Sequence, residues 1–297
     1  MPVDVVGGRR IVRPLPPPSA APDVVLAPDV VLAPDGMERS RVVAPSALSR
    51  ATVVERAKRA AVPQRVQVGP TCGLYALGMV MDFWHAKDPA NPTALVQDRD
   101  RAGRGKQYTL EPTTSERILT VAKELGFTAL GEMFTARQLA KTAEHFGYVA
   151  TTHEDATLDA LYRVLDAGHP AIVAFDVDHN GDPADHGGDR AHYAIIQGYF
   201  DGPDGRMLVA RHGWGVQEDH VWSAERFDTS WKALHTTAFY GEPGDDIIPD
   251  HPGVDEPDRM TLPDAGGGRA KIYDSLGTKI VEVVPPGESP VGGTRAA

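Results

Sequence analysis

The apolar positions of the chain divide it into a helical part followed by a strand part. An almost unbroken apolar run at residues 72–84 predicts a helix that is buried on every side, because it has no polar face. Three amphipathic stretches follow, each opened by a capping residue and closed by glycine, at residues 113–126, 135–147 and 155–168. These stretches predict three helices that pack one face on a common core.

The pattern changes to strands after residue 169. Residues 171–175 and 192–199 are short apolar runs, and the turn sequence Asp-Gly-Pro-Asp-Gly predicts a hairpin from the second run into residues 207–210. A short helix at 224–234 and a last strand at 236–240 complete the series. Helices first and antiparallel strands second predict the α+β class.

Composition sets the expected boundaries of the domain. Residues 63–241 predict one compact domain of ordinary size, with residues 87–112 as a polar surface loop. Residues 242–297 are rich in Pro and Gly, which predicts a linker and tail with one small β-hairpin at 270–284.

Residues 1–62 are rich in proline and contain the direct repeat Ala-Pro-Asp-Val-Val-Leu, so they predict an extended, disordered segment. A delivery signal, a propeptide and a docking strand are alternatives that the sequence leaves open. A short helix is expected at residues 49–61 within this segment.

Charge and apolar content exclude several classes of protein. The net charge of −11 argues against nucleic acid as the main partner. No apolar run reaches the roughly 18 residues that a membrane span needs, and the N-terminus lacks a secretory signal pattern. A single cysteine excludes an internal disulfide and is compatible with a reducing compartment. We expect a cytoplasmic protein, with delivery to another cell through the N-terminal segment left open.

The one cysteine, Cys72, is the first candidate for chemistry. It follows the turn signal Gly69-Pro70 and the N-cap candidate Thr71, so its thiol lies in the first turn of the buried helix. The helix dipole lowers the pKa of a thiol by about 1.5 units at best, which is too little for an active thiolate. A catalytic Cys72 therefore requires a histidine from elsewhere in the chain, and the alternative is a buried, inert cysteine.

His192 is the candidate partner because it begins an apolar strand directly after a polar loop. Along a strand it shares one face with Ala194, Ile196 and Gly198, which are small enough to leave space for a helix end. The chain holds 11 histidines, so this choice needs support beyond the pattern.

Several short motifs supply that support. A helix opened by Gly69-Pro70-Thr71-Cys72-Gly73-Leu74 precedes the segment Gly126 to Phe134, then Gly168-His169-Pro170, Asp176-Val177-Asp178 and Ala191-His192-Tyr193-Ala194. In this order the motifs resemble the actin maturation protease family, which is related to the papain-like and C39-like cysteine peptidases. The resemblance covers residues 67–234 and implies a papain-like fold.

The resemblance also implies roles for individual residues. Cys72 is the expected nucleophile and His192 the expected general base. Gln67 is the expected oxyanion donor, with Gln64 as the alternative. The residue that orients the histidine is Asn or Asp in papain-like peptidases, and the corresponding position here is His212.

Because histidine carries no fixed negative charge, Asp176 and Asp178 remain alternatives for the third role, and a Cys-His dyad is a further one. Glu132, Asp176 and Trp214 are expected to border the substrate cleft. Residues 176–181 imitate half of a calcium loop, but position 12 of that loop is Gly187 and not Glu, so no metal site and no cofactor are expected.

The sequence thus predicts a cysteine peptidase that acts on a protein or peptide, with processing of protein N-termini as the family's example. An acyltransferase on the same residues and an inactive binding module remain the alternatives.

Overall fold

The computed structural model describes residues 49–102, 106, 108–214, 219–238, 260–261, 271–273 and 276–292. The helices are α1 (Arg50–Ala57), α2 (Cys72–Lys87), α3 (Ile118–Glu124), α4 (Ala136–His145), α5 (Leu158–Asp166) and α6 (Ala224–Ala233). The first strands are β1 (Arg65–Val66), β2 (Arg101–Ala102), β3 (Val149–His153), β4 (Ala171–Asp176), β5 (Ala191–Gly202) and β6 (Gly205–Arg211). The remaining strands are β7 (His220–Ser223), β8 (Thr236–Ala238), β9 (Met260–Thr261), β10 (Lys271–Tyr273) and β11 (Ile280–Val284).

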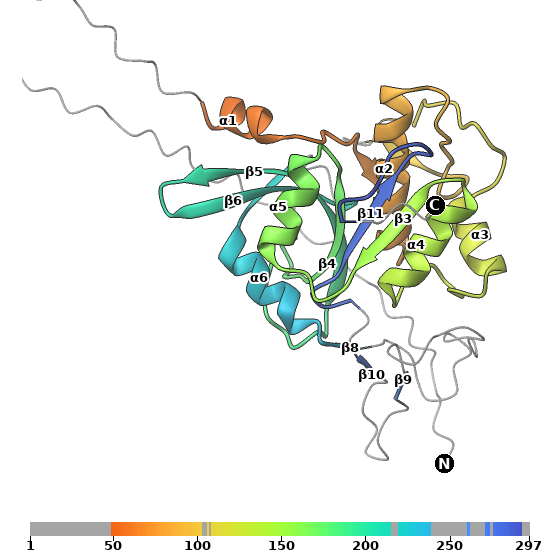
Figure 1. Cartoon of the computed structure of the whole chain (residues 1–297). Helices are drawn as coiled ribbons and strands as arrows, with labels where there is room; N and C mark the ends of the chain where they lie inside the picture. The colour runs from red at the N-terminus through yellow and green to blue at the C-terminus, as the bar shows by residue number, and fades with distance from the viewer. Residues whose placement is uncertain are drawn as a thin grey trace, which may run out of the picture. The chain divides into compact units, whose positions relative to one another are not determined.

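A six-stranded sheet in the order β3-β11-β4-β5-β6-β7 lies at the centre, and all of its pairings are antiparallel (Figure 1). The predicted hairpin is formed by β5 and β6, which pair from Gly202 and Gly205 back to Ile195 and Arg211. Two small antiparallel sheets, β1-β2 and β8-β10-β9, stand apart from it. Helices packed on an antiparallel sheet confirm the predicted α+β class.

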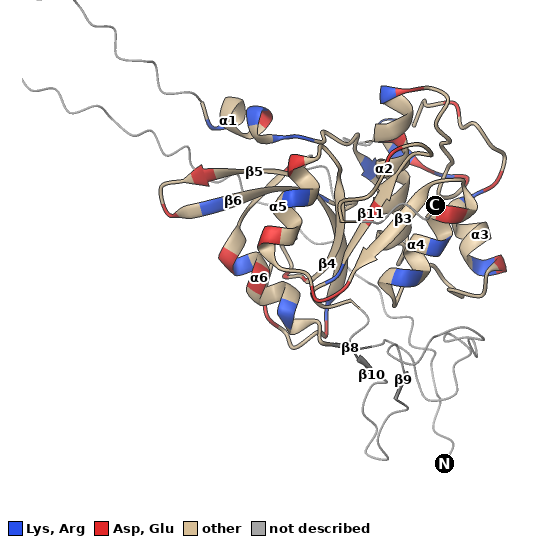
Figure 2. Ribbon diagram, in the orientation of Figure 1, with Lys and Arg blue, Asp and Glu red and all other residues tan. Residues whose placement is uncertain are grey.

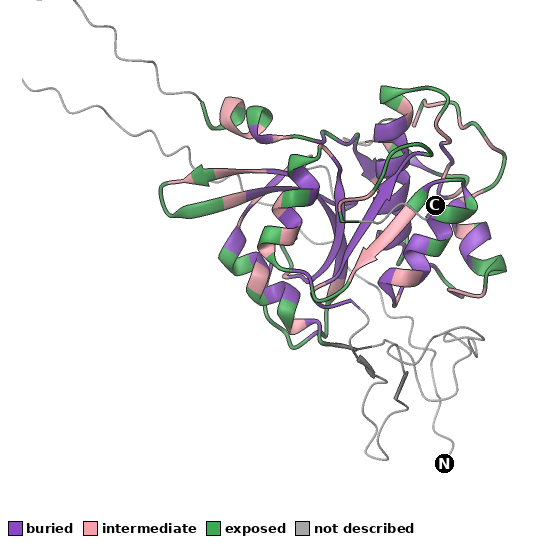
Figure 3. Ribbon diagram, viewed as in Figure 1, coloured by how far each residue is buried: buried purple, intermediate pink, exposed green. Residues whose placement is uncertain are grey.

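Both faces of the sheet are covered by helices. On β4, the side chains of Ile172 and Ala174 join the core formed with α2, α3 and α4, whereas Val173 and Phe175 join the core formed with α5 and α6. This division follows from the alternation of side chains along a strand. The centre of the sheet is buried throughout, and exposure is concentrated on the outer faces of the helices (Figure 3).

Helix α2 is buried on nearly every side, as its apolar sequence predicts. Its one buried carboxylate, Asp82, forms an ion pair with the fully buried Arg65 at 2.6 Å. Arg65 also contacts Asp100 at 3.2 Å, so two carboxylates compensate one buried guanidinium. The segment predicted as a surface loop, residues 87–112, therefore contributes to the interior through Asp100 and through Thr93, which is fully buried.

Two of the predicted helix starts are wrong. α3 begins at Ile118, because the hydroxyl of Thr113 donates to the carbonyl of Thr93 and does not cap a helix. α5 is capped by Thr157 and not by Asp155. The start predicted at Thr135 is correct, since the Thr135 hydroxyl accepts from the N–H of Gln138 at the start of α4.

The C-terminal region does not form the predicted hairpin at 270–284. β10 pairs with β8 and β9, whereas β11 inserts between β3 and β4 in the central sheet. All five residues of β11 are buried. The compact domain therefore requires a strand from beyond residue 241, and most of the tail itself lies outside the described residues.

The end of the predicted disordered segment is folded. α1 forms within residues 49–61, as expected, and residues 57–62 dock on the sheet. The carbonyl of Gln197 accepts from the N–H groups of Arg59 and Ala60, and its side-chain oxygen accepts from Val62. Residues 49–62 thus belong to the domain, and the repeats at 21–32 lie outside the described residues.

Charged residues lie mainly on the outer faces of the helices and in the loops (Figure 2). Within the described part of the chain, no helix has both the length and the apolar character needed to cross a membrane.

Candidate active site

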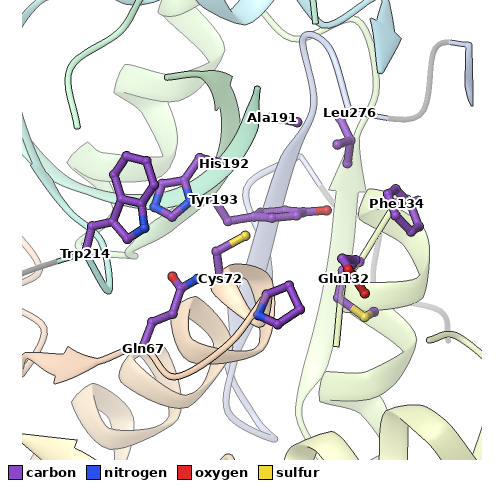
Figure 4. A pocket seen from close by; sticks show the side chains of 11 residues that line it. Gln67, Cys72, Glu132, Phe134, Ala191, His192, Tyr193, Trp214 and Leu276 are labelled. Carbon is purple, nitrogen blue, oxygen red and sulfur yellow. The ribbon is translucent and has the colours of Figure 1, made fainter. Parts of the chain in front are cut away.

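A cavity of about 310 Å³ opens where the start of α2 meets the start of β5. Its walls include Gln67, Cys72, Glu132, His192 and Trp214, five of the seven residues that the sequence placed at the site. Figure 4 shows the sulfur of Cys72 between the amide of Gln67, the ring of His192 and the ring of Tyr193. The structure therefore brings together a thiol and an imidazole that are separated by 120 positions in the sequence.

Cys72 is the first residue of α2, and Thr71 precedes it at the N-cap. The Thr71 hydroxyl donates to the carbonyl of Val68 and makes no capping bond, so the helix start remains open toward the cavity. Tyr193 packs against Gly73 in the first turn. The face of β5 that meets α2 is thus that of Tyr193 and not that of His192.

His192 shares the opposite face of β5 with Ala194 and Ile196, which pack under α5 and α6. Because His192 is the second residue of β5, it reaches the cavity of Cys72 from the end of the strand. His192 thus lines the same cavity as Cys72, as expected. The residues behind it, however, pack against the sheet's other helical layer and not against the helix that carries Cys72.

Burial keeps both candidate groups neutral in the resting site. Burial raises the pKa of the Cys72 thiol, and nearby backbone N–H groups of Tyr193 and Gly73 offset this only in part. Burial also lowers the pKa of His192 to about 3. Positive charge on the nearby His220 adds to this only in acid, because burial lowers the pKa of His220 too. At neutral pH the resting pair is therefore a thiol and a neutral imidazole.

The contacts of His212 define which nitrogen of His192 carries the proton and which carries the lone pair. Nε2 of His192 lies 3.2 Å from Nδ1 of His212, and the backbone N–H of Trp214 points at the same Nδ1 from 3.3 Å. A backbone N–H only donates, so Nδ1 of His212 is an acceptor and its ring proton lies on Nε2. His192 consequently donates through Nε2–H, and its Nδ1 carries the lone pair that accepts a proton.

Trp214 covers the imidazole of His192. The two rings stack with centroids 4.9 Å apart and an angle of 29° between their planes, while 41% of Trp214 remains exposed. The indole thus shields His192 from water, and its free edge forms part of the cavity wall.

The two glutamines have different environments. The amide of Gln64 is buried and donates to the carbonyls of Arg65 and His212, so it is directed away from the cavity. The Gln67 amide donates one hydrogen to Gly69 at 2.8 Å, and Figure 4 shows its nitrogen on the side of Cys72. The remaining N–H of Gln67 has no hydrogen-bond partner among the described residues.

Asp176 is not part of the cavity, contrary to expectation. Its side chain is fully buried at the end of β4 and accepts from the N–H groups of His186 and Gly188, so it organises the loop at 177–190. Asp178 accepts from the N–H groups of Asn180 and Asp182. Neither carboxylate reaches His192, because each is engaged by the backbone of its own loop.

The cavity wall opposite His192 is apolar apart from Glu132. Met133, Phe134 and Leu276 line it, and burial raises the pKa of Glu132. Among the described residues, no lysine, arginine or histidine forms an ion pair with Glu132. Leu276 was not predicted at the site because it lies in the Pro/Gly-rich region, next to β11, a strand that was expected in a separate hairpin and not in the central sheet.

Among the described residues, no group of three or more His, Cys, Asp or Glu side chains is arranged to hold a metal ion.

Comparison with known proteins identifies relatives of the central part of the chain. The family model described as actin maturation protease-like, C-terminal domain, matches residues 105–200, a segment with Glu132 and His192 but without Cys72. The actin maturation protease of Mus musculus is 31% identical over 150 residues, which are 48% of this chain and 34% of that protein. That of Drosophila melanogaster is 34% identical over 153 residues, or 50% and 47% of the two chains.

The chain thus spans between a third and a half of the length of these curated relatives. A solved structure of a C39-like peptidase from Bacillus anthracis matches 59% of this chain and 91% of its own, with 14% identity and a TM-score of 0.36. That score is too low to support an argument from its geometry. The sequence comparisons confirm that the central part of this chain resembles the actin maturation protease family.

Proposed function

We propose that this protein is a cysteine peptidase that hydrolyses a peptide bond of a protein or peptide. Cys72 is the nucleophile, His192 the general base and acid, Gln67 an oxyanion donor and His212 the residue that orients His192. The observation that carries the proposal is the shared cavity in which the only cysteine faces a histidine whose Nε2 is already bonded to a third residue.

Acylation starts from the neutral pair. Nδ1 of His192 takes the proton of Cys72 as the sulfur attacks the substrate carbonyl carbon. The C=O bond becomes a C–O single bond with a negative oxygen. The imidazolium then gives its proton to the leaving amine as the C–N bond breaks, which leaves a thioester on Cys72.

Deacylation repeats the sequence with water. Neutral His192 removes a proton from water as the oxygen attacks the thioester, and the proton returns to the sulfur when the C–S bond breaks. In both halves the negative oxygen needs fixed donors. We assign this role to the N–H at the start of α2 and to the second amide hydrogen of Gln67.

The cavity favours a substrate segment with an apolar side chain. Its volume of about 310 Å³ and its lining by Met133, Phe134 and Leu276 suit a large apolar residue next to the scissile bond. Processing of protein N-termini, which the resemblance to the actin maturation protease family implies, is the form of peptidase activity that we propose for it. The cytoplasmic location expected from the sequence remains a prediction.

The test is a comparison of N-termini in a proteome treated with wild-type protein or with Cys72→Ala. New N-termini that appear only with the wild type support a peptidase. Products in which an amine has been acylated, without new N-termini, would assign the site to acyl transfer. Identical profiles for the two proteins, together with unreactive Cys72, would leave a binding module.

A further inference from the structure

The ring contacts of His192 continue beyond His212 to a third histidine. The imidazole of His220 lies against that of His212, with ring centroids 4.2 Å apart and an angle of 31° between the planes. Beyond it, a carboxylate oxygen of Asp182 lies 3.7 Å from Nδ1 of His220. The side chains therefore form a series from the catalytic histidine to a carboxylate, and all three histidines in it are buried.

The carboxylate of Asp182 is held in place by its own loop and by a tryptophan. The N–H of Asp182 donates to the side chain of Asp178 at 3.0 Å, and its carbonyl accepts from the N–H of Asp178 at 2.9 Å. The indole Nε1 of Trp222 donates to Asp182 Oδ1 at 3.1 Å. These contacts direct one carboxylate oxygen toward His220.

Gly181 brings the same loop against both histidines. Its φ of +88° lies in the left-handed region, and a Cβ at this position would come within 2.9 Å of the His212 ring and 3.2 Å of the His220 ring. Only glycine satisfies the angle and the close approach together. The calcium-like pattern at residues 176–181 is thus explained by a turn that packs on two imidazoles.

Asp182 is the carboxylate whose charge is directed at His220. Three acidic side chains surround this histidine, and two have other cations: Asp219 lies 2.8 Å from Arg211, and Asp178 lies 3.7 Å from Arg226. Among the described residues, no lysine or arginine pairs with Asp182.

We propose that His220 and Asp182 are positioning residues of the Cys72 site. Asp182 favours the Nδ1–H form of His220, and the ring of His220 holds His212 with its Nδ1 toward His192. The carboxylate then supplies the negative charge that a histidine in the third position lacks. This inference rests on the proposed function, because it concerns the stability of the His192 imidazolium formed when Cys72 loses its proton.

The single cysteine allows a test that needs no substrate, since alkylation by iodoacetamide reports the thiolate of Cys72 alone. The rate is measured against pH for the wild type, Asp182→Asn and His220→Gln. The control is Asp185→Asn, which removes an exposed carboxylate of the same loop. We expect the profiles of Asp182→Asn and His220→Gln to move to higher pH by about one unit relative to the wild type, or about tenfold slower alkylation at a fixed pH below the midpoint. The control should not move.

His220→Phe provides a second variant that keeps a ring against His212 but has no Nδ1. It should show the same shift while its thermal midpoint stays close to that of the wild type. Loss of thermal stability in these variants without any change of the alkylation profile would assign the two residues a structural role only and overturn the inference.

His192→Ala separates the two possible failures. If this variant leaves the alkylation profile unchanged, the Cys72–His192 pair itself is wrong and the proposed function fails with it. If His192→Ala changes the profile and Asp182→Asn does not, only the role of His220 and Asp182 is overturned.

Discussion

At the scale of single residues, Gln67 carries the clearest expectation. Gln67→Ala removes the amide that we propose as an oxyanion donor but leaves the thiol and the imidazole in place. We expect kcat to fall by about 10²–10³, because that is the usual effect of losing one oxyanion donor. Alkylation of Cys72 should stay at the wild-type rate. A variant with full activity would exclude Gln67 from the site.

Trp214 tests the origin of the low pKa of His192. Burial lowers this pKa to about 3, and the indole forms part of that burial. Trp214→Ala admits water, so the pKa should rise toward the ordinary value of about 6.5. Since His192 accepts a proton only when neutral, the acidic limb of kcat/KM should move to higher pH. Trp214→Phe keeps the stacked ring and should leave that limb in place.

The sequence predicted which residues line the cavity where a local motif marks them. The turn before Cys72 and the loop before His192 are visible in the sequence, and both side chains line the cavity. Asp176 was misplaced because a buried carboxylate that holds a loop and a carboxylate that binds substrate have the same sequence signal. His220 was missed because its contacts with His212 and Asp182 form only in the folded sheet.

At the scale of elements, β11 depends on a buried cluster of one carboxylate and two histidines. The side chain of Glu282 is fully buried between His153 Nε2 at 2.6 Å and His169 Nδ1 at 2.5 Å. Burial acts to raise the pKa of Glu282, but the hydrogen bonds with the two histidines and with the N–H of Val291 outweigh it, so the pKa is lowered. The cluster fixes the strand between β3 and β4.

Glu282→Gln should therefore lower the free energy of unfolding at neutral pH by about 3 kcal/mol, the usual cost of breaking a buried pair. Because the folded pKa lies below the unfolded value of about 4.3, this stability is complete above that value and is lost as the pH falls through the folded pKa. The difference from the wild type, measured by denaturant titration, should shrink in acid.

The matched control is Glu116→Gln, which breaks an exposed contact with His145 at 3.1 Å and should cost about 1 kcal/mol or less. Equal effects of the two substitutions at neutral pH would contradict the role given to Glu282.

β11 also shows why some elements were predicted correctly and others were not. α2 and β4 are continuous apolar runs that any packing must bury, so the sequence marks them clearly. β11 is five residues long, lies in a Pro/Gly-rich region and has a glutamate at its centre. Its burial depends on two histidines more than 100 positions away, which no local pattern reveals.

At the scale of the whole molecule, the domain should not fold without β11. Its buried Ile280, Val281, Val283 and Val284 contribute about 1.5–3 kcal/mol each, so their loss is comparable to the total stability of a typical domain, about 5–15 kcal/mol. A chain of residues 47–241 should show no cooperative thermal transition. A chain of residues 47–297, which form one compact unit, should show one. A cooperative transition in the shorter chain would restore the predicted boundary at residue 241.

The central claim is that Cys72 and His192 together hydrolyse a peptide bond. Its most direct test is digestion of a proteome-derived peptide library in water enriched in heavy oxygen, with wild type, Cys72→Ser and His192→Ala. We predict new C-termini carrying one heavy oxygen with the wild type only, because water opens the thioester. Absence of such termini with the wild type, or their presence with Cys72→Ser, would contradict the account.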